Sequence, residues 1–399
     1  MAPVPDYRVV DNRKTVQEPG IHALIVGVSN YVNLPDHDDP PRKEKWLLNQ
    51  LTSPALSALK IFDFLQQNPL RLPIKTIRLL LAPSLVEVRA EPRLLTVTSI
   101  RPNQETFKQF ARSWRDDANT NPDDMTIFYF AGHGVQRGDD GVLLLEDFRP
   151  DSDLPLDGSC EIGNIRGGMG RTAGFANIAM TQFYFVDACR TQEETLKNFL
   201  DPKSPPVFGV QLTGPERRVT PTMFSTVDGG FALGQDGKPS HFATALERAF
   251  LHGADESMDL NGRSVWPVTS VTIARSLELY YQNKKLGGFS GGGGVMGTPV
   301  FRYLADPPDV DIAVQIQPDK LSEKCGIEIH DENGGPVGCC GPTAESQYET
   351  IVKAGIYRIE LESGLLTSSP YRSELKYLTQ KVFWPWKHNL TRLLRPPPP

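Results

Sequence analysis

Two short, continuously apolar runs constrain the fold of this chain more than any other feature. They are Thr126–Phe130 and Phe183–Val186, and both are rich in aromatic and β-branched residues. Runs of this length are too short for helices, and a strand that is buried on both faces lacks alternating polar residues. The two runs therefore predict central strands of a mostly parallel sheet.

Each run is followed by a segment that carries a reactive side chain. Ala131-Gly132-His133-Gly134 follows the first run, and Asp187-Ala188-Cys189-Arg190 follows the second. Residues just beyond the carboxyl ends of parallel strands line the crevice of an open α/β sheet. We therefore expect His133 and Cys189 to lie side by side although they are far apart in the sequence.

An imidazole beside a thiol can activate it as a nucleophile and can protonate a leaving amine. The backbone N–H groups of Gly134 and Cys189 are predicted to form an oxyanion hole, because a small-residue turn allows a substrate to approach closely. Taken singly, a histidine in a glycine turn is usually structural, and a cysteine after an apolar strand is usually a small core residue. The paired arrangement favours the catalytic interpretation.

The remaining pattern predicts a βαβ organisation. Further strands are expected at 22–28 and 77–81, and helices at 55–65 and 104–115. This order predicts an α/β domain with a mostly parallel sheet and helices on both faces.

In these segments the chain resembles the caspase-like cysteine peptidases, and the bacterial and metacaspase branch more than the animal caspases. The resemblance extends over residues 20–303, and it implies a further strand at 223–226, a helix at 241–246 and a closing segment at 298–301. It implies a cysteine endopeptidase in which His133 activates Cys189 and no cofactor is required. By analogy, it also suggests a bacterial defence effector that cleaves one protein target when triggered.

Asp187 is the candidate specificity residue. It stands two positions before Cys189, where the resemblance gives metacaspases an aspartate and animal caspases a glutamine. A carboxylate there would pair with Lys or Arg before the scissile bond and would repel Asp. The family's second pocket acid is expected at the start of the first helix, where this chain has Ser53-Pro54-Ala55. A structural role for Asp187 therefore stays open.

Composition shifts divide the chain further. We expect an N-terminal extension at 1–19, a caspase-like domain at 20–305, a C-terminal β-sandwich at 309–382 and an aromatic, basic and proline-rich tail at 383–399. Within the caspase-like domain we expect a polar insertion at 35–50, an exposed linker at 190–220 and a flexible glycine-rich loop at 287–297. Candidate processing positions in the linker are Lys203, Arg217 and Arg218, and the competing hypothesis is activation by a partner without cleavage.

The C-terminal segments 310–316, 326–329, 348–352 and 357–361 alternate apolar and polar residues, which predicts a small antiparallel sandwich. We expect this domain to dock a regulatory partner or substrate. Cys325, His330, Cys339 and Cys340 have the wrong spacing for a usual zinc site. For the tail, packing on the chain's own surface is favoured over a membrane or partner contact.

The net charge and the cysteine content limit which partners and which cellular compartment we expect. A net charge of −6 without a basic block argues against nucleic acid as a partner, and no apolar run is long enough to cross a membrane. Five cysteines, an odd number, predict a reducing cytoplasm. Calcium stays open, because acids cluster between the catalytic strands at Asp139, Asp140, Glu146, Asp147, Asp151, Asp153 and Asp157. The alternative function is a non-catalytic or permanently closed signalling adaptor that acts through its C-terminal domain.

Overall fold

The computed structural model describes residues 8–36, 46–138, 140–191, 196–197, 199–200, 202–210, 217–227, 229–230, 232, 234–254, 257–292, 297–317, 325–331, 333–341, 347–363, 380–382 and 388–393. The chain divides into two compact units. The first comprises residues 1–247 and 284–299, and the second comprises residues 248–283 and 300–399. The two units are described one after the other.

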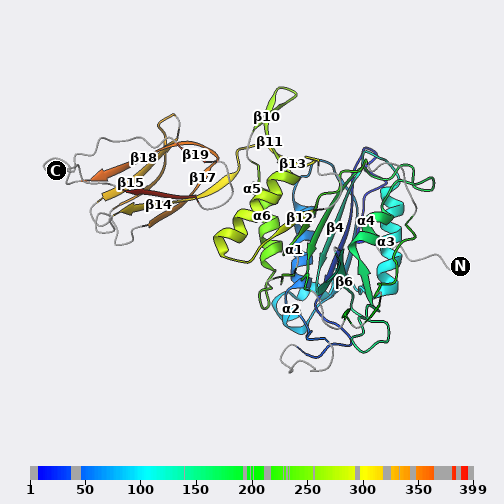
Figure 1. The fold of residues 1–399 in the computed structure, drawn as a ribbon. Coiled ribbons are helices and arrows are strands. Elements are labelled where there is room, and N and C mark those ends of the chain that lie inside the picture. Colours follow the sequence, from blue (N-terminus) through cyan, green and yellow to red (C-terminus); the bar gives the residue numbers. More distant parts are fainter. Residues whose placement is uncertain are drawn as a thin grey trace. The chain divides into compact units, whose positions relative to one another are not determined.

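A seven-stranded sheet forms the centre of the first unit, in the order β1-β3-β2-β4-β8-β9-β12 (Figure 1). Its five inner strands run parallel, and the edge strands β1 and β12 are antiparallel to their neighbours. The predicted mostly parallel sheet is therefore confirmed. The bounds are β1 (Val10–Asp11), β2 (Ile21–Val28), β3 (Ile74–Ala82), β4 (Met125–Ala131), β8 (Thr181–Asp187), β9 (Thr222–Phe224) and β12 (Ser290–Gly292).

Helices cover both faces of this sheet (Figure 1). Alternate residues of β2 point to opposite faces, and Leu24 and Val26 pack in one core with the apolar residues of α3 (Gln104–Ala118). On the other face, Gly27 leaves room for α1 (Pro54–Gln67), because a Cβ there would lie 2.8 Å from Ala58 Cβ. Shorter helical segments are α2 (Leu85–Ala90), the 3-10 helix Pro92–Leu95 and α4 (Ile162–Gly168).

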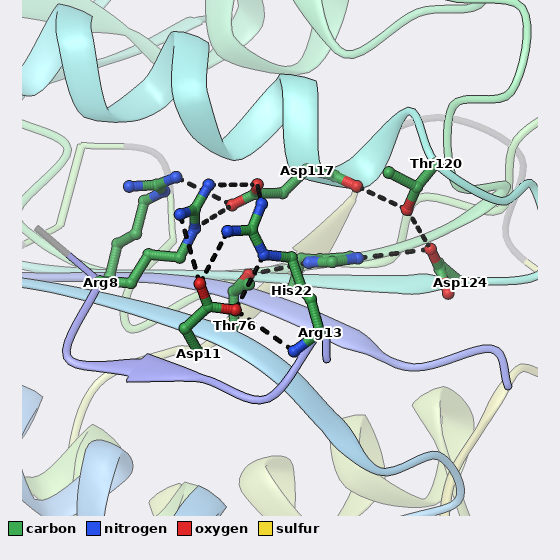
Figure 2. Close-up of polar contacts among 9 residues, drawn as sticks. Arg8, Asp11, Arg13, His22, Thr76, Asp117, Thr120 and Asp124 are labelled. Atoms are coloured by element: carbon green, nitrogen blue, oxygen red, sulfur yellow. Dashed lines mark hydrogen bonds and ion pairs between the residues drawn. The ribbon is translucent and has the colours of Figure 1, made fainter. Parts of the chain in front are cut away.

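A buried polar cluster fixes the sheet at the amino ends of its parallel strands (Figure 2). The Asp117 carboxylate accepts hydrogen bonds at 2.9 Å from both Arg8 and Arg78. The Asp124 carboxylate accepts bonds at 2.9 Å from Lys75 and 3.0 Å from Thr120, and lies 3.3 Å from His22 Nε2. This cluster lies at the strand ends opposite to those followed by His133 and Cys189.

The segment between β4 and β8 has more structure than the sequence predicts. Besides α4, it contains a three-stranded sheet of β5 (Gly134–Arg137), β6 (Asp140–Leu144) and β7 (Ser159–Glu161).

Two segments expected to be loops in this unit contain more structure than the sequence predicts. Within the expected exposed linker 190–220, Val207 and Phe208 are buried, and Phe208 lies under the guanidinium of Arg115 at 4.4 Å. Within the expected glycine-rich loop, β12 pairs with β9. Backbone hydrogen bonds to an existing strand can order glycines that have no side chain to pack.

The second unit contains further antiparallel pairs and a sandwich. Sheet β10-β11-β13 holds the expected closing segment, so this segment pairs with β11 and lies outside the seven-stranded sheet. The strands are β10 (Met258–Leu260), β11 (Arg263–Thr269) and β13 (Val300–Leu304), and α6 (Ser270–Lys284) precedes β12 in the chain. Helix α5 (His241–His252) crosses the boundary between the units.

The sandwich has one sheet in the order β17-β14-β20 and another in the order β16-β15-β18-β19. Val310 and Val352 from the first sheet share a core with Ile327, Ile329 and Tyr357 from the second. Strands β14 and β20 are parallel, so the sandwich is not wholly antiparallel as predicted. The bounds are β14 (Asp309–Gln317), β15 (Cys325–Asp331), β16 (Pro336–Cys340), β17 (Gln347–Lys353), β18 (Gly355–Ser363), β19 (Gln380–Val382) and β20 (His388–Leu393).

The aromatic, basic and proline-rich tail expected at 383–399 lies partly outside the described residues. These include 388–393 but neither 383–387 nor 394–399. No helix in the described part of the chain has the length and apolar character needed to cross a bilayer. Across the same described part, no cluster of three or more His, Cys, Asp or Glu side chains is arranged to hold a metal ion.

Candidate active site

A cavity of about 280 Å³ opens at the carboxyl ends of β4 and β8. Its lining includes His133, Asp187 and Cys189, which come from segments far apart in the sequence. The parallel register of β4 and β8, in which Ala131 pairs with Asp187, places the two following segments next to each other. The rest of the lining comes from Gly132 beside His133, from the residues before and at the start of α1, and from the loop after β9. The residues from the last two segments are Leu51, Thr52, Ser53, Pro54, Ala232, Gly234, Gln235, Asp236 and Ser240.

The two glycines beside His133 allow its segment to approach the cysteine segment and the loop after β2. A Cβ on Gly134 would lie 2.8 Å from the Cys189 carbonyl oxygen, and a Cβ on Gly132 would lie 2.8 Å from the Tyr31 hydroxyl oxygen. Both separations are too short for a real side chain. The Gly-His-Gly sequence is therefore required by close packing at this position.

His133 is held through both its backbone and its ring. Its backbone N–H donates to the Tyr31 hydroxyl at 2.7 Å, and its Nε2 lies 2.7 Å from the Asn49 carbonyl oxygen. Because a carbonyl only accepts, Nε2 must carry the proton, and Nδ1 is then the unprotonated nitrogen of the neutral ring. Burial lowers the pKa of His133 to about 4, so the neutral ring predominates near pH 7.

Asn49 and Tyr31 are positioning groups that the sequence does not reveal. Asn49 lies in the segment expected as a polar insertion at 35–50, and it acts through a backbone carbonyl that has no side-chain signature. Tyr31 is fully buried, and its ring centroid lies 5.0 Å from that of His133. A tyrosine shortly after the first strand is the one available signal, but its partner is fixed only by the fold.

Cys189 is not part of a disulfide, and its side chain is partly exposed. The backbone N–H of Ala232 donates to its Sγ at 3.2 Å. The same loop is bonded to Arg190, which donates through its backbone N–H to Gly230 O at 3.0 Å and accepts from Gly229 N–H at 2.8 Å. The loop after β9 therefore lies directly against the cysteine segment.

Asp187 is 6% exposed and accepts hydrogen bonds from the hydroxyls of Ser240 and Tyr129, the latter at 3.4 Å. Burial raises the pKa of its carboxyl to about 6, although the hydroxyl donors act in the opposite direction. The carboxylate is thus ionised in most molecules at pH 7. It supplies negative charge in the cavity that also holds Cys189.

Several acids considered for calcium have other partners. Asp140 accepts from the Gly163 N–H at the start of α4, and Asp147 accepts from the Gln104 N–H at the start of α3. Glu146 pairs with Arg101. Asp139 lies outside the described residues.

The candidate processing residues differ in exposure. Lys203 and Arg217 are exposed, whereas Arg218 is 7% exposed. Arg218 donates to the Arg166 carbonyl at 2.8 Å and to the Gln182 side chain at 3.1 Å. Cleavage after Arg218 would therefore require local unfolding.

Comparisons with known proteins extend this description. The sequence model of the caspase domain matches residues 21–263, more than half of the chain. The uncharacterized protein y4kE of Sinorhizobium fredii is 30% identical over 179 residues, which cover 42% of this chain and 48% of that protein. The chain thus spans about half the length of this relative.

Two solved structures also align with the chain. Protein GSU0716 from Geobacter sulfurreducens aligns with a TM-score of 0.40 and 12% identity, covering 69% of this chain and 95% of that one. Caspase-1 from Spodoptera frugiperda aligns with a TM-score of 0.37 and 15% identity, covering 70% of this chain and 81% of that one.

The family match includes strands β2 to β9, and it therefore contains both His133 and Cys189. The strand order and the parallel arrangement of β4 and β8 agree with the mostly parallel sheet that the resemblance implied. The chain therefore belongs to the caspase domain family.

Proposed function

We propose that this protein is a cysteine endopeptidase in which Cys189 is the nucleophile and His133 is the general base. One observation carries the proposal: a single cavity is lined by the thiol, the imidazole and the Asp187 carboxylate. The hydrogen bond from His133 Nε2 to Asn49 O supports the assignment, because it leaves Nδ1 as the nitrogen that can accept a proton.

In the proposed reaction, Nδ1 of His133 takes the proton of the Cys189 thiol, and the thiolate attacks the scissile carbonyl carbon. The Gly134 and Cys189 N–H groups stabilise the oxyanion of the tetrahedral intermediate. His133 then gives its proton to the leaving amine, which departs and leaves a thioester on Cys189. Water, deprotonated by His133, hydrolyses the thioester and restores the thiol.

We further propose that the enzyme cleaves after Arg or Lys. Asp187 would pair with the cationic side chain of the residue before the scissile bond, and charge repulsion would exclude Asp. Activation would be controlled by a protein partner, for which the C-terminal sandwich provides a separate folded module.

Two substitutions test the dyad. Cys189→Ala should abolish peptide cleavage, and His133→Ala should lower kcat/KM by several orders of magnitude, because a nucleophile and its base act as a unit. Cys339→Ala is the matched control, since Cys339 is an exposed cysteine on β16. Cleavage at wild-type rates by Cys189→Ala, with a circular dichroism spectrum equal to that of the wild type, would refute the assignment.

One contact favours the alternative of a closed signalling adaptor, namely the Ala232 N–H that donates to Cys189 Sγ. A loop in this position could prevent a substrate from reaching the thiol. Labelling distinguishes the two functions. In an adaptor, Cys189 should react with iodoacetamide or with neither reagent. In a peptidase, Cys189 should also react with a peptidyl-arginine chloromethyl ketone once the partner is present.

A further inference from the structure

The cavity contains a second carboxylate from a part of the chain that the family resemblance does not indicate. Asp236 lies in the loop after β9 and lines the same cavity as Asp187 and Cys189. Asp236 is exposed, whereas Asp187 is 6% exposed. The two acids thus lie in one cavity at different depths from solvent.

The loop that carries Asp236 is fixed to the segment where α1 begins. Gly237 N–H donates to the Thr52 carbonyl at 3.1 Å, and the Ser53 hydroxyl donates to the Lys238 carbonyl at 2.7 Å. Gly237 has a φ of +61°, a conformation that glycine adopts without strain, and so it turns the chain directly after Asp236.

Ser53 begins the segment in which the resemblance leads one to expect the second pocket acid. Here its hydroxyl does not cap α1 and is bonded to the loop instead. A residue of the segment where the second acid is expected therefore holds in place a loop that carries another acid. This arrangement compensates in three dimensions for a carboxylate that is missing from the sequence motif.

Asp187 has limited capacity to bind a cation alone. Its Oδ2 already accepts from Ser240 and Tyr129, and the carboxyl is buried. A guanidinium has five N–H donors in a planar fork and can contact two separate carboxylates, whereas an ammonium is a compact point charge. Two acids in one cavity therefore suit arginine better than lysine.

We propose that Asp236 is the second specificity acid of this cavity and that, with Asp187, it selects arginine before the scissile bond. The inference rests on the proposed function of the cavity as the binding site for that residue. Asp236 is a specificity residue and takes no part in bond breaking.

The first test is cleavage of peptides that differ only in Arg, Lys or citrulline before the scissile bond. Asp236→Asn should lower kcat/KM for the Arg peptide about tenfold, mainly through KM, which is the usual effect of losing one exposed charge-assisted hydrogen bond. The citrulline peptide should be little affected, and Asp236→Glu should restore part of the Arg preference. Asp123→Asn is the matched control, because Asp123 is exposed before β4 at the other end of the sheet.

The second test measures binding without turnover. Benzamidine, a small amidinium cation, should protect Cys189 of the full-length chain from iodoacetamide, with labelling quantified at each cysteine by mass spectrometry. Exposed Cys339 serves as the internal standard for reactivity. Asp236→Asn should require about tenfold more benzamidine for equal protection, and Asp123→Asn should behave as the wild type.

The two tests separate the inference from the proposed function. If no peptide is cleaved but benzamidine protection depends on Asp236, the peptidase assignment fails and the cation site stands. If Arg peptides are cleaved and Asp236→Asn behaves like Asp123→Asn in both tests, the inference is overturned and the peptidase assignment stands. An equal loss for Arg and citrulline peptides would also overturn it, because it would mean that Asp236 only maintains the loop.

Discussion

At the scale of single residues, a few buried polar atoms determine what the cavity can do. The Tyr31 hydroxyl accepts the His133 backbone N–H, and the Asn49 carbonyl accepts the proton on the His133 ring. Together they fix both the position and the tautomer of the His133 ring. Burial lowers the pKa of His133 but raises that of Asp187, because in both cases it disfavours the charged form of the side chain.

We expect Tyr31→Phe to impair both stability and catalysis. Removing the hydroxyl leaves the His133 N–H buried without this acceptor, which costs about 1–3 kcal/mol of stability, and kcat should fall because His133 is less well fixed. Tyr184→Phe is the matched control, because it removes another buried tyrosine hydroxyl, bonded to Gln182 and not part of the cavity lining. Urea unfolding and kcat measurements check both variants, and equal kcat values would remove Tyr31 from the catalytic arrangement.

The pKa of Asp187 predicts a pH-dependent preference. Because this carboxyl is protonated below about pH 6, the attraction for Arg should weaken as the pH falls through that value. The quantity to measure is the ratio of kcat/KM for an Arg peptide to that for its citrulline analogue between pH 5 and 8, since effects on the dyad cancel in the ratio. In Asp187→Asn the ratio should be lower and show no inflection near pH 6. An inflection that survives the substitution would have to come from another group.

At the scale of elements, the start of α1 depends on a carboxylate from elsewhere in the chain. Ser53 makes no side-chain cap, and instead Glu87 Oε1 accepts from the Ala55 and Leu56 N–H groups at 2.9 and 3.2 Å. Glu87 itself is fully buried on α2, and burial raises the pKa of its carboxyl. Because residues at the start of α1 line the cavity, this cap connects α2 to the candidate active site.

Glu87→Gln should therefore destabilise the first unit by about 1–3 kcal/mol. The Ser84 and Ala55 N–H groups donate to different oxygens of the Glu87 carboxylate, and in glutamine one of these oxygens becomes an NH2 group, which cannot accept. The chemical-denaturation midpoint is the measurement. Glu105→Gln is the control, because Glu105 is exposed in the first turn of α3. A midpoint shift no larger than that of the control would show that the cap contributes little.

At the scale of the whole molecule, the structure limits where a protease can cut the chain after Cys189. The segment after Cys189 is packed at Val207 and Phe208, and the Arg218 side chain is tied to the Arg166 carbonyl. Only parts of this segment are therefore open to a protease. The two candidate positions Lys203 and Arg217 remain exposed.

Brief digestion of the native protein with trypsin should cut after Lys203 or Arg217 before it cuts after Arg218. The reason is that a protease needs an extended, accessible chain, which buried and hydrogen-bonded residues do not provide. Mass analysis of the first fragments reads this out, and the Arg218 site should open in moderate urea. Fragments that begin at Val219 from the fully native protein would contradict the expectation.

The sequence by itself determined the central strands, their parallel direction and the place of His133 and Cys189 at their carboxyl ends. It could do so because these features depend on local patterns: an apolar run forms a buried strand, and a polar segment directly after it lies at the sheet edge. The same local reasoning found most strands of the C-terminal sandwich. It missed the short strands β16 and β19, and also β20, whose hydrogen-bonding partner β14 is distant in the sequence.

Only the tertiary structure decided which groups complete the cavity. The Asn49 carbonyl, Tyr31, the Glu87 cap and Asp236 all act through contacts between segments that are remote in the chain. Part of the expected glycine-rich loop likewise forms strand β12, because it pairs with the edge of β9. Backbone carbonyls and loop carboxylates have no sequence periodicity, and so their roles arise only when the fold brings their partners within hydrogen-bonding distance.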